Sequence, residues 1–457
     1  MRNFKKLISL LLGFTSVLSL NAQEETSGRI ELSLEDVLDY AKANNLQIQN
    51  ARLDLKASRL QKDEAFCEYL PKVNAMALGF YAMNPLLELG ITDILGDNDF
   101  SWQLQEKAQE LSGVYGFNTK YTAFKNGYST SISLMQPLYA GGRIVNGNKL
   151  ASIGVEASQL QLSLQERKTS EEIEKDWWQI ASLEEQIENL KYLDGSLETI
   201  YKQLQDAVGS GLSAQSELLQ LEVKRKELKS GLKKAESGVR LLKLNLLSNI
   251  GLKGLQLDSV SFKKTPLEPE SPEYYYRDPE RIIGNMEESR LLELQVRAKQ
   301  MEKKMSIGES LPQVAVGATA GYSDFYDKTK FNTIAFATIQ IPLSDWIKTS
   351  KKAQRIQTEV QKAENEREYL QRQLHLLVDK LYLELSSAYD QWQVKEELQN
   401  SCQRLYEMAL SNYTAGLIPL QEVLQAESQY HNASAECTEA LVEYRNSIIA
   451  YTSLLKD

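Results

Sequence analysis

The sequence predicts a mainly α-helical chain with a β-barrel portion, built as a two-fold internal repeat of long coiled-coil helical hairpins. Each chain is expected to supply four membrane β-strands, and the barrel to be completed by oligomerisation. Three observations predict this fold: a Gly-Leu element that occurs twice, heptad-like helical patterns around each copy, and two pairs of alternating strands. The repeat is considered first because a repeat determines the architecture.

The repeat is carried by Gly211-Leu212 and Gly416-Leu417, which lie 205 positions apart. Over the stretch that begins at each glycine, Gly, Leu, Glu, Leu, Gln and Glu recur in register. Pro137-Leu138 and Pro342-Leu343 keep the same offset. Each Gly-Leu element stands between two long helical patterns, so it is predicted to form the tip of a helical hairpin.

Residues 1–22 have the features of a secretory signal peptide. Its parts are a positive start (Arg2, Lys5 and Lys6), an apolar core (Leu7 to Leu18) and a small-residue cleavage site (Leu20-Asn21-Ala22). An N-terminal membrane anchor is the alternative, but the apolar core is too short to span a bilayer. No later stretch has about 18 continuous apolar residues, so insertion in a membrane would require β-strands.

Composition and motif content exclude several functions. The chain has 457 residues and a net charge of -10, whereas a nucleic-acid binder needs a basic surface. His375 and His431 are too few for a histidine-based metal centre, and no phosphate loop or nucleophile motif stands out. Neighbouring carboxylates such as Glu171, Glu172 and Glu174 are typical of a solvated helix face. We therefore predict no enzyme, no cofactor and no metal site.

Each repeat is predicted to open on a helix that ends at a proline. In the first repeat, Ser33 is the expected N-cap because acids follow in the first turn. That helix is predicted to run to about Tyr69 and to end at Pro71. In the second repeat, the helix runs from about Glu287 to Pro312.

A pair of strands follows each opening helix, over 72–137 and 313–342. In the first pair, Met76, Leu78 and Phe80 share one face, and residues 83 to 126 are predicted to be irregular. The next strand, predicted to end at Pro137, alternates Tyr128, Thr130, Ile132 and Leu134 with Ser129, Ser131 and Ser133. In the second pair, Val314, Val316, Ala318, Ala320 and Tyr322 alternate with small or polar residues, and Thr333 to Ile341 follow. One apolar face per strand fits lipid outside and water inside.

Very long helices then begin near Gly142 and Thr349. Their apolar seams are Ile180, Leu183, Ile187, Leu190, Leu193, Leu197, Ile200 and Leu204, and Leu370, Leu374, Leu377, Leu381, Leu385, Ala388 and Trp392. After the tips, the seams continue with Leu221, Leu228, Leu232, Ala235, Val239, Leu242 and Leu246, and with Tyr430, Ala433, Cys437, Leu441, Tyr444 and Ile448. Such spacing makes helices coil around each other.

The predicted organisation is a first repeat over 23–251, a connection over 252–286 and a second repeat over 287–457. The connection is rich in proline and contains Tyr274-Tyr275-Tyr276, a run that is predicted to pack onto neighbouring helices. A functional aromatic patch is the alternative. The cysteines are Cys67, Cys402 and Cys437. A Cys402–Cys437 disulfide is the pairing to test in an exported protein, but their unequal distances from the tip favour free thiols.

Four strands cannot close a barrel with a lumen, so closure needs several copies of the chain. Three copies would give 12 strands and 12 long helices, although the pattern itself does not fix the number at three.

The chain resembles the TolC family of outer-membrane efflux and secretion channels over nearly all of the mature sequence. The residues that carry the resemblance are Ser33-Leu34-Glu35-Asp36-Val37-Leu38 with Ala41 and Asn44, Leu70-Pro71, Gln136-Pro137-Leu138-Tyr139 with Gly141-Gly142, and the two Gly-Leu tips. The resemblance implies a homotrimer with a TolC-like outer-membrane barrel and a helical tunnel through the periplasm. It also implies a periplasmic adaptor (membrane fusion) protein that links the tips to an inner-membrane transporter.

Carried onto this sequence, the resemblance implies that Gly211, Leu212, Gly416 and Leu417 contact the adaptor; the alternative is that the glycines are merely turn residues. It implies that Glu422, Gln425 and Tyr413 form the constriction of the periplasmic mouth, with Tyr413 in the network that closes it. Glu422 as a solvated helix residue is the alternative. Gln425 stands where a second acid is often found, and Ile418 where some members have an arginine, so an arginine latch is in doubt here.

The expected function is therefore a channel that gives small molecules a passive exit duct across periplasm and outer membrane, within a tripartite efflux pump. The outer channel of a type I protein secretion system has the same tunnel and is the alternative. A structural coiled-coil protein or adhesin of the envelope explains the heptads but not the paired amphipathic strands. The sequence does not identify the substrate, the pump or the gating trigger.

Overall fold

The structure is a computed structural model that describes residues 30–84, 87–116, 121–123, 126–251, 260–263, 270–324, 330–343 and 345–455. The expected signal peptide lies outside these ranges, as does part of the predicted connection. The chain divides into two compact units. The sheet unit comprises Asn50–Leu164 and Asp278–Leu377, and the hairpin unit comprises Met1–Gln49, Gln165–Arg277 and Val378–Asp457. Each unit therefore combines segments from both predicted repeats.

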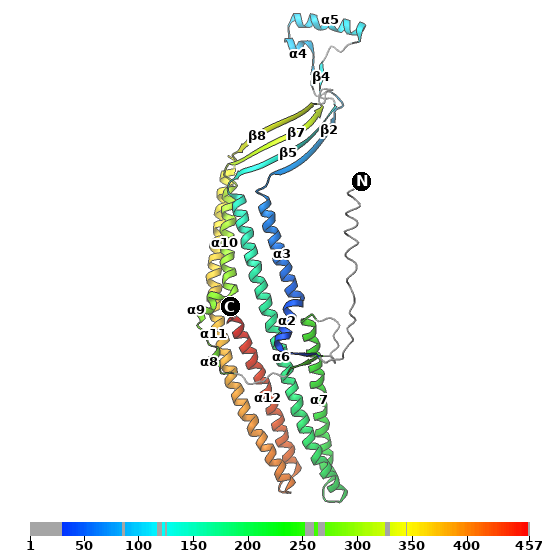
Figure 1. The fold of residues 1–457 in the computed structure, drawn as a ribbon, viewed down its shortest axis with the longest axis vertical. Helices are drawn as coiled ribbons and strands as arrows, with labels where there is room; N and C mark the ends of the chain where they lie inside the picture. Colours follow the sequence, from blue (N-terminus) through cyan, green and yellow to red (C-terminus); the bar gives the residue numbers. More distant parts are fainter. Residues whose placement is uncertain are drawn as a thin grey trace, which may run out of the picture. The chain divides into compact units, whose positions relative to one another are not determined.

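The sheet unit contains a four-stranded antiparallel sheet with the strand order β2-β5-β7-β8 (Figure 1). Its strands are β2 (Lys72–Tyr81), β5 (Asn126–Ala140), β7 (Gln313–Asp324) and β8 (Lys330–Gln340). Both predicted strand pairs are thus confirmed, and β5 pairs with β7 to join them. Within the described chain, β2 and β8 are each paired on one side only.

The register separates an apolar face of the sheet from a second face, which we call the serine face because Ser129, Ser131 and Ser133 lie on it. On the apolar face, Ile132 of β5 lies opposite Ala320 of β7. At one end of this face the rings of Tyr322 and Phe331 lie 5.0 Å apart. Aromatic side chains that border an apolar band are typical of strands at a membrane interface.

The register does not place the apolar residues of all four strands on one side of the sheet. Met76 of β2 pairs with Ser131 and Leu78 pairs with Ser129. Directly opposed residues of an antiparallel pair point to the same side of the sheet, so Met76 and Leu78 lie on the serine face. Alternation within one strand shows which residues share a face, but only pairing with the neighbour shows which face that is.

The predicted end of β5 was wrong. The strand does not end at Pro137 but continues to Ala140, with a register shift between Pro137 and Tyr139. Such a bulge accommodates a proline, which has no backbone N–H to donate.

Residues 83 to 126 are not simply irregular. They contain α4 (Ile91–Leu95), α5 (Asp99–Tyr115) and the short paired strands β3 (Leu87–Leu89) and β4 (Tyr121–Ala123). Asn98 caps α5, because its side chain accepts a hydrogen bond from Ser101 N at 2.9 Å. Gly116 ends the helix with a φ of 71°.

The first mature helix is interrupted, although Ser33 is its N-cap as predicted. The Ser33 hydroxyl accepts a hydrogen bond from Asp36 N at 3.2 Å. The helix is divided into α2 (Leu34–Asn44) and α3 (Leu46–Cys67) by Asn45, whose ψ is 128°. The Asn45 side chain accepts from Gln47 N at 2.8 Å and donates to Asn249 O at 2.8 Å. Asn45 therefore starts α3 and ties the break to the end of α7 (Gln215–Asn249).

Four long helices form the two predicted hairpins: α6 (Arg143–Gly209) with α7, and α11 (Asp345–Thr414) with α12 (Leu420–Thr452). Most predicted seam residues of the first hairpin are buried, including Ile180, Ile187, Leu190, Leu193, Leu197, Ile200, Leu204, Leu221, Leu228, Val239 and Leu246. In α11 the buried residue of one turn is Val378, whereas the predicted Leu377 is 37% exposed. The heptad pattern thus identified the packing faces to within one residue.

The remaining described segments are the parallel pair β1 (Ile30–Leu32) and β6 (Val260–Phe262), α8 (Pro272–Tyr275), α9 (Pro279–Asn285), α10 (Glu287–Gly308) and a final 3-10 turn, Ser453–Leu455. Of the predicted tyrosine run, Tyr276 packs on Tyr382 of α11 with the rings 5.0 Å apart, whereas Tyr274 is 63% exposed.

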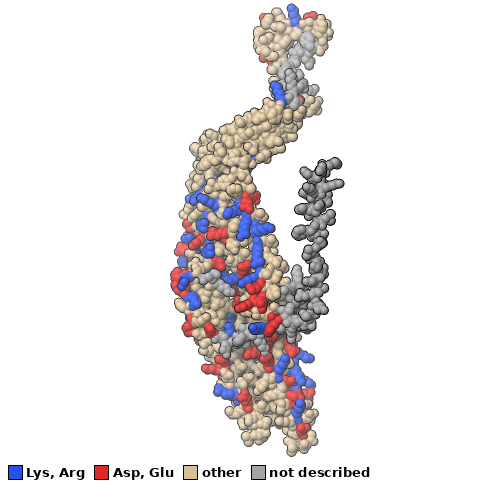
Figure 2. All heavy atoms as spheres, viewed as in Figure 1, with Lys and Arg blue, Asp and Glu red and all other residues tan. Residues whose placement is uncertain are grey.

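The cysteines are all free thiols, with Cys67 exposed, Cys402 half-buried and Cys437 buried. Charged side chains gather over the helices on the face drawn in Figure 2, and the strands there show few. None of the described helices combines the length and apolarity that crossing a membrane requires.

Candidate functional site

Both predicted tips fold as the same helix-ending turn. Gly211 and Gly416 have left-handed backbone, with φ values of 72° and 74°. Leu212 N–H donates to the carbonyl five residues earlier at 2.8 Å, and Leu417 N–H does so at 2.9 Å. This is the Schellman motif, in which glycine takes the left-handed position at little steric cost. The repeat in the sequence is therefore also a repeat in backbone conformation.

The leucine of each tip points into solvent. Leu212 is 83% exposed and Leu417 is 73% exposed. In many Schellman motifs the residue at this position packs back onto its own helix. Exposed apolar side chains at matching places of two hairpins form a contact surface for another molecule more readily than an isolated one.

The two hairpins are packed together behind their tips. One hydrophobic cluster includes Leu197 of α6, Leu221 of α7, Tyr406 of α11 and Val423 of α12. The Tyr406 hydroxyl donates a hydrogen bond to Ser196 Oγ at 2.8 Å. Burial raises the pKa of Tyr406 to about 12.

The structure brings two of the three predicted mouth residues together. Glu422 and Gln425 are exposed near the start of α12, and residues three apart are neighbours on a helix surface. Tyr413 is half-buried near the end of α11 and packs against the cluster behind the tips. Burial raises the pKa of Tyr413. The contacts of the described residues do not join Tyr413 to Glu422 or to Gln425.

Sequence reasoning missed a charged pair between the hairpins. Lys224 Nζ of α7 lies 2.9 Å from Glu427 Oε2 of α12, and Glu427 is fully buried. Burial raises the pKa of Glu427, although Lys224 opposes that shift. A signal was present, because Glu427 is the repeat counterpart of Glu222. Glu222, however, pairs at the surface with Lys226 at 2.8 Å, so the repeat keeps the residue and changes its surroundings.

Two helices carry apolar residues at seven-residue spacing on sides that are more than half exposed. They are Leu46, Leu53 and Leu60 on α3, and Tyr369, Leu376 and Leu383 on α11. A seven-residue apolar spacing is the seam along which one helix packs against another. Within the described part of the chain, no helix covers these two stripes.

Comparison with known proteins gives a consistent picture. The family model described as "Outer membrane efflux protein" matches residues 37–226 and 290–455. No curated protein matches the sequence. A membrane protein from Pseudomonas aeruginosa is similar in structure, with a TM-score of 0.73, 13% identity and 93% of each chain covered.

Two solved outer membrane channels are also similar. The CmeC channel of Campylobacter jejuni has a TM-score of 0.69 and 15% identity, over 92% of this chain and 85% of that chain. The open state of the MtrE channel of Neisseria gonorrhoeae has a TM-score of 0.69 and 13% identity, over 94% of this chain and 92% of that chain. At these identities the likeness shows a shared fold.

Proposed function

This chain belongs to the outer membrane efflux protein family, and from that premise we propose that three copies form the passive exit duct of a tripartite efflux pump. The duct gives small molecules a path across the outer membrane, with the helical part in the periplasm. An inner-membrane transporter would supply the energy, and a periplasmic adaptor would connect the transporter to the tips.

The observation that carries this proposal is that one chain is incomplete. The sheet has an exposed apolar face and two edge strands of 10 and 11 residues, β2 and β8. A long edge strand presents unpaired N–H and C=O groups, which lipid cannot satisfy. Pairing β2 of one copy with β8 of the next satisfies these groups, and the stripes on α3 and α11 supply apolar seams for packing between copies.

The tips are proposed to be the contact with the adaptor. Leu212 and Leu417 offer apolar side chains on turns that the Schellman hydrogen bonds hold in place. A pre-formed turn loses little conformational entropy when it binds. The two tips belong to hairpins that share one hydrophobic cluster, so an adaptor can engage both at once.

Glu422 is proposed to line the constriction of the mouth, with Gln425 beside it. Both side chains are exposed on the first turns of α12. Copies of Glu422 around a threefold axis would form a ring of carboxylates, and such a ring favours cations. Tyr413 would act by holding the end of α11 against the hydrophobic cluster.

The test is single-channel conductance of the purified mature protein in a planar bilayer. We expect discrete conductance steps, and lower cation selectivity for Glu422→Gln. Glu236→Gln is the matched control, because Glu236 is an exposed carboxylate far along α7 from the tip. Steps with unchanged selectivity in Glu422→Gln would remove that residue from the constriction and keep the channel. A folded protein that never inserts as an oligomer would contradict the channel itself.

A further inference from the structure

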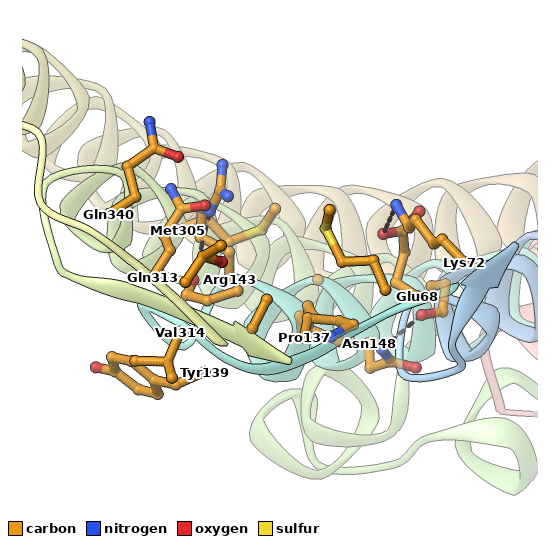
Figure 3. A pocket seen from close by; sticks show the side chains of 17 residues that line it. Glu68, Lys72, Pro137, Tyr139, Arg143, Asn148, Met305, Gln313, Val314 and Gln340 are labelled. Atoms are coloured by element: carbon orange, nitrogen blue, oxygen red, sulfur yellow. Dashed lines mark hydrogen bonds and ion pairs between the residues drawn. The ribbon is translucent and has the colours of Figure 1, made fainter. Parts of the chain in front are cut away.

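A cavity of about 460 Å³ lies within the sheet unit, where the strands meet α3, α6 and α10. Pockets of roughly 300–1,000 Å³ accommodate drug-sized molecules. Figure 3 shows Arg143, Gln313 and Gln340 at one end of the cavity and the Glu68–Lys72 pair at the other. Nothing in the proposed duct function uses this cavity.

The cavity opens beneath the serine face of the sheet. Lys72 of β2 is opposite Met135 of β5, which shares a face with Ser133. Pro137 is opposite Ala315, which is opposite Thr338 of β8. Lys72, Met135, Pro137, Ala315 and Thr338 all line the cavity. The cavity is therefore on the serine face and not on the face that carries Ile132.

The backbone holds Arg143 rigidly at the cavity wall. Gly141 and Gly142, which precede α6, have φ values of 62° and 74°. Gly141 packs directly on Gly308 at the end of α10, so that a Cβ at Gly308 would lie 2.4 Å from Gly141 O. This close approach fixes the first residue of α6, and Arg143 Nε donates to Ala140 O at 3.4 Å.

The charge of Arg143 is not compensated by the described side chains. The other cation of the cavity, Lys72, is paired with Glu68 at 2.8 Å. Glu309, which follows α10, is paired with Lys352 at 2.7 Å. No described carboxylate lies within ion-pair distance of the half-buried Arg143 guanidinium. A guanidinium presents a rigid fork that matches carboxylates and similar oxyanions.

The body of the cavity is apolar and adaptable. Met135 and Met305 contribute thioether side chains, and Ile144 contributes a branched one. Methionine side chains adjust to ligands of different shape. The cavity therefore combines one unpaired cation with an adjustable apolar wall.

We propose that this cavity binds amphipathic organic anions, with the anionic group on Arg143 and the apolar body against Met135 and Met305. Such anions are then one class of exported cargo, which binds transiently beneath the sheet during export. The role as cargo rests on the proposed duct, whereas binding itself does not.

The experiment is calorimetric titration of the full-length mature protein in nanodiscs of zwitterionic lipid, with empty nanodiscs as the blank. The probes are naphthalene-1-carboxylate and 1-naphthylmethylammonium, which share an apolar body and differ in charge. We expect the anion to bind at least about tenfold tighter than the cation, because only the anion forms charge-assisted hydrogen bonds with Arg143. Equal binding of the two probes, or no binding, would overturn the proposal.

Variants locate the site. Arg143→Gln should lower the affinity for the anionic probe by about tenfold or more. Lys149→Gln should leave this affinity unchanged, because Lys149 is exposed on α6 and does not line the cavity. If Arg143→Gln fails to fold, Met305→Gln is the second variant. It keeps the charge of Arg143 and should lower the affinity for both probes, because it makes the apolar wall of the cavity polar. Unchanged binding in a folded variant would overturn the assignment. Conductance of the wild type distinguishes the cavity proposal from the duct proposal. A protein that conducts but does not bind the anion would refute the cavity proposal and leave the duct proposal intact.

Discussion

Lys224 and Glu427 join the two hairpins by an ion pair of 2.9 Å, and Glu427 is fully buried. The pair lies behind the tips that are proposed to meet the adaptor. Removing the partner of a buried charge costs more than removing a whole pair, because the remaining charge is left uncompensated. Removing Lys224 alone should therefore lower the free energy of unfolding more than replacing both residues with apolar ones.

We predict that Lys224→Ala destabilises the hairpin unit by about 3–5 kcal/mol, because Glu427 loses its only described cation. The double change Lys224→Met with Glu427→Leu should recover most of that loss. The control is Lys226→Ala, which breaks the surface pair with Glu222 and should cost no more than about 1 kcal/mol. Calorimetric unfolding of the purified protein measures all three losses. Equal losses for Lys224→Ala and Lys226→Ala would contradict the prediction.

His431, one turn beyond Glu427, gives the hairpins a pH dependence. Burial first and Lys224 second lower the pKa of His431 below its ordinary value of 6.5. The folded chain therefore holds this histidine neutral, and its contribution to stability is present above about pH 6.5 and is lost as the pH falls. Glu427 acts in the opposite direction, because its pKa lies above the ordinary value of 4.5. Its contribution is present at low pH and is lost as the pH rises.

We therefore expect His431→Gln to lose less stability than wild type as the pH falls from 7.5 to 5.5, and Glu427→Gln to lose more than wild type as the pH falls to 4.5. The readout is the unfolding temperature of the purified protein at pH 7.5, 5.5 and 4.5, with each variant compared with itself. Identical shifts in wild type and His431→Gln would show that other groups set the acid response.

The hairpins and tips were predictable because their signals are local. Heptad spacing identifies a helix face, and a Gly-Leu pair after a helical seam identifies a left-handed turn. The features that escaped prediction depend on segments distant in sequence. Met76 lies on the serine face because of its pairing with Ser131, and Glu427 is buried because a second hairpin covers it.

Two glycine substitutions should have opposite effects on stability, because Gly308 is in close contact with Gly141 and Gly154 has open space around it. Gly308→Ala places a Cβ 2.4 Å from Gly141 O and 2.9 Å from Arg143 Cγ, so α6 and α10 must move apart, at a cost of about 1–3 kcal/mol. Gly154→Ala, within α6, meets nothing within 4 Å and should stabilise the chain by about 0.5–1 kcal/mol. Thermal unfolding distinguishes the two, and a loss of the same size in both would show that backbone freedom and not the close contact governs Gly308.

The tips allow backbone and contact effects to be separated. Leu212→Ser and Leu417→Ser remove side chains that are 83% and 73% exposed, so folding stability should be nearly unchanged while the affinity for the adaptor falls by about tenfold or more. Gly211→Ala instead strains a backbone with a φ of 72° and should cost about 1–2 kcal/mol of stability. Leu241→Ser is the matched control, because Leu241 is 68% exposed on α7 away from the tip. Interferometry with the purified adaptor measures affinity. If Leu212→Ser, Leu417→Ser and Leu241→Ser bind the adaptor equally well, the tips hold the hairpin turn without making the contact.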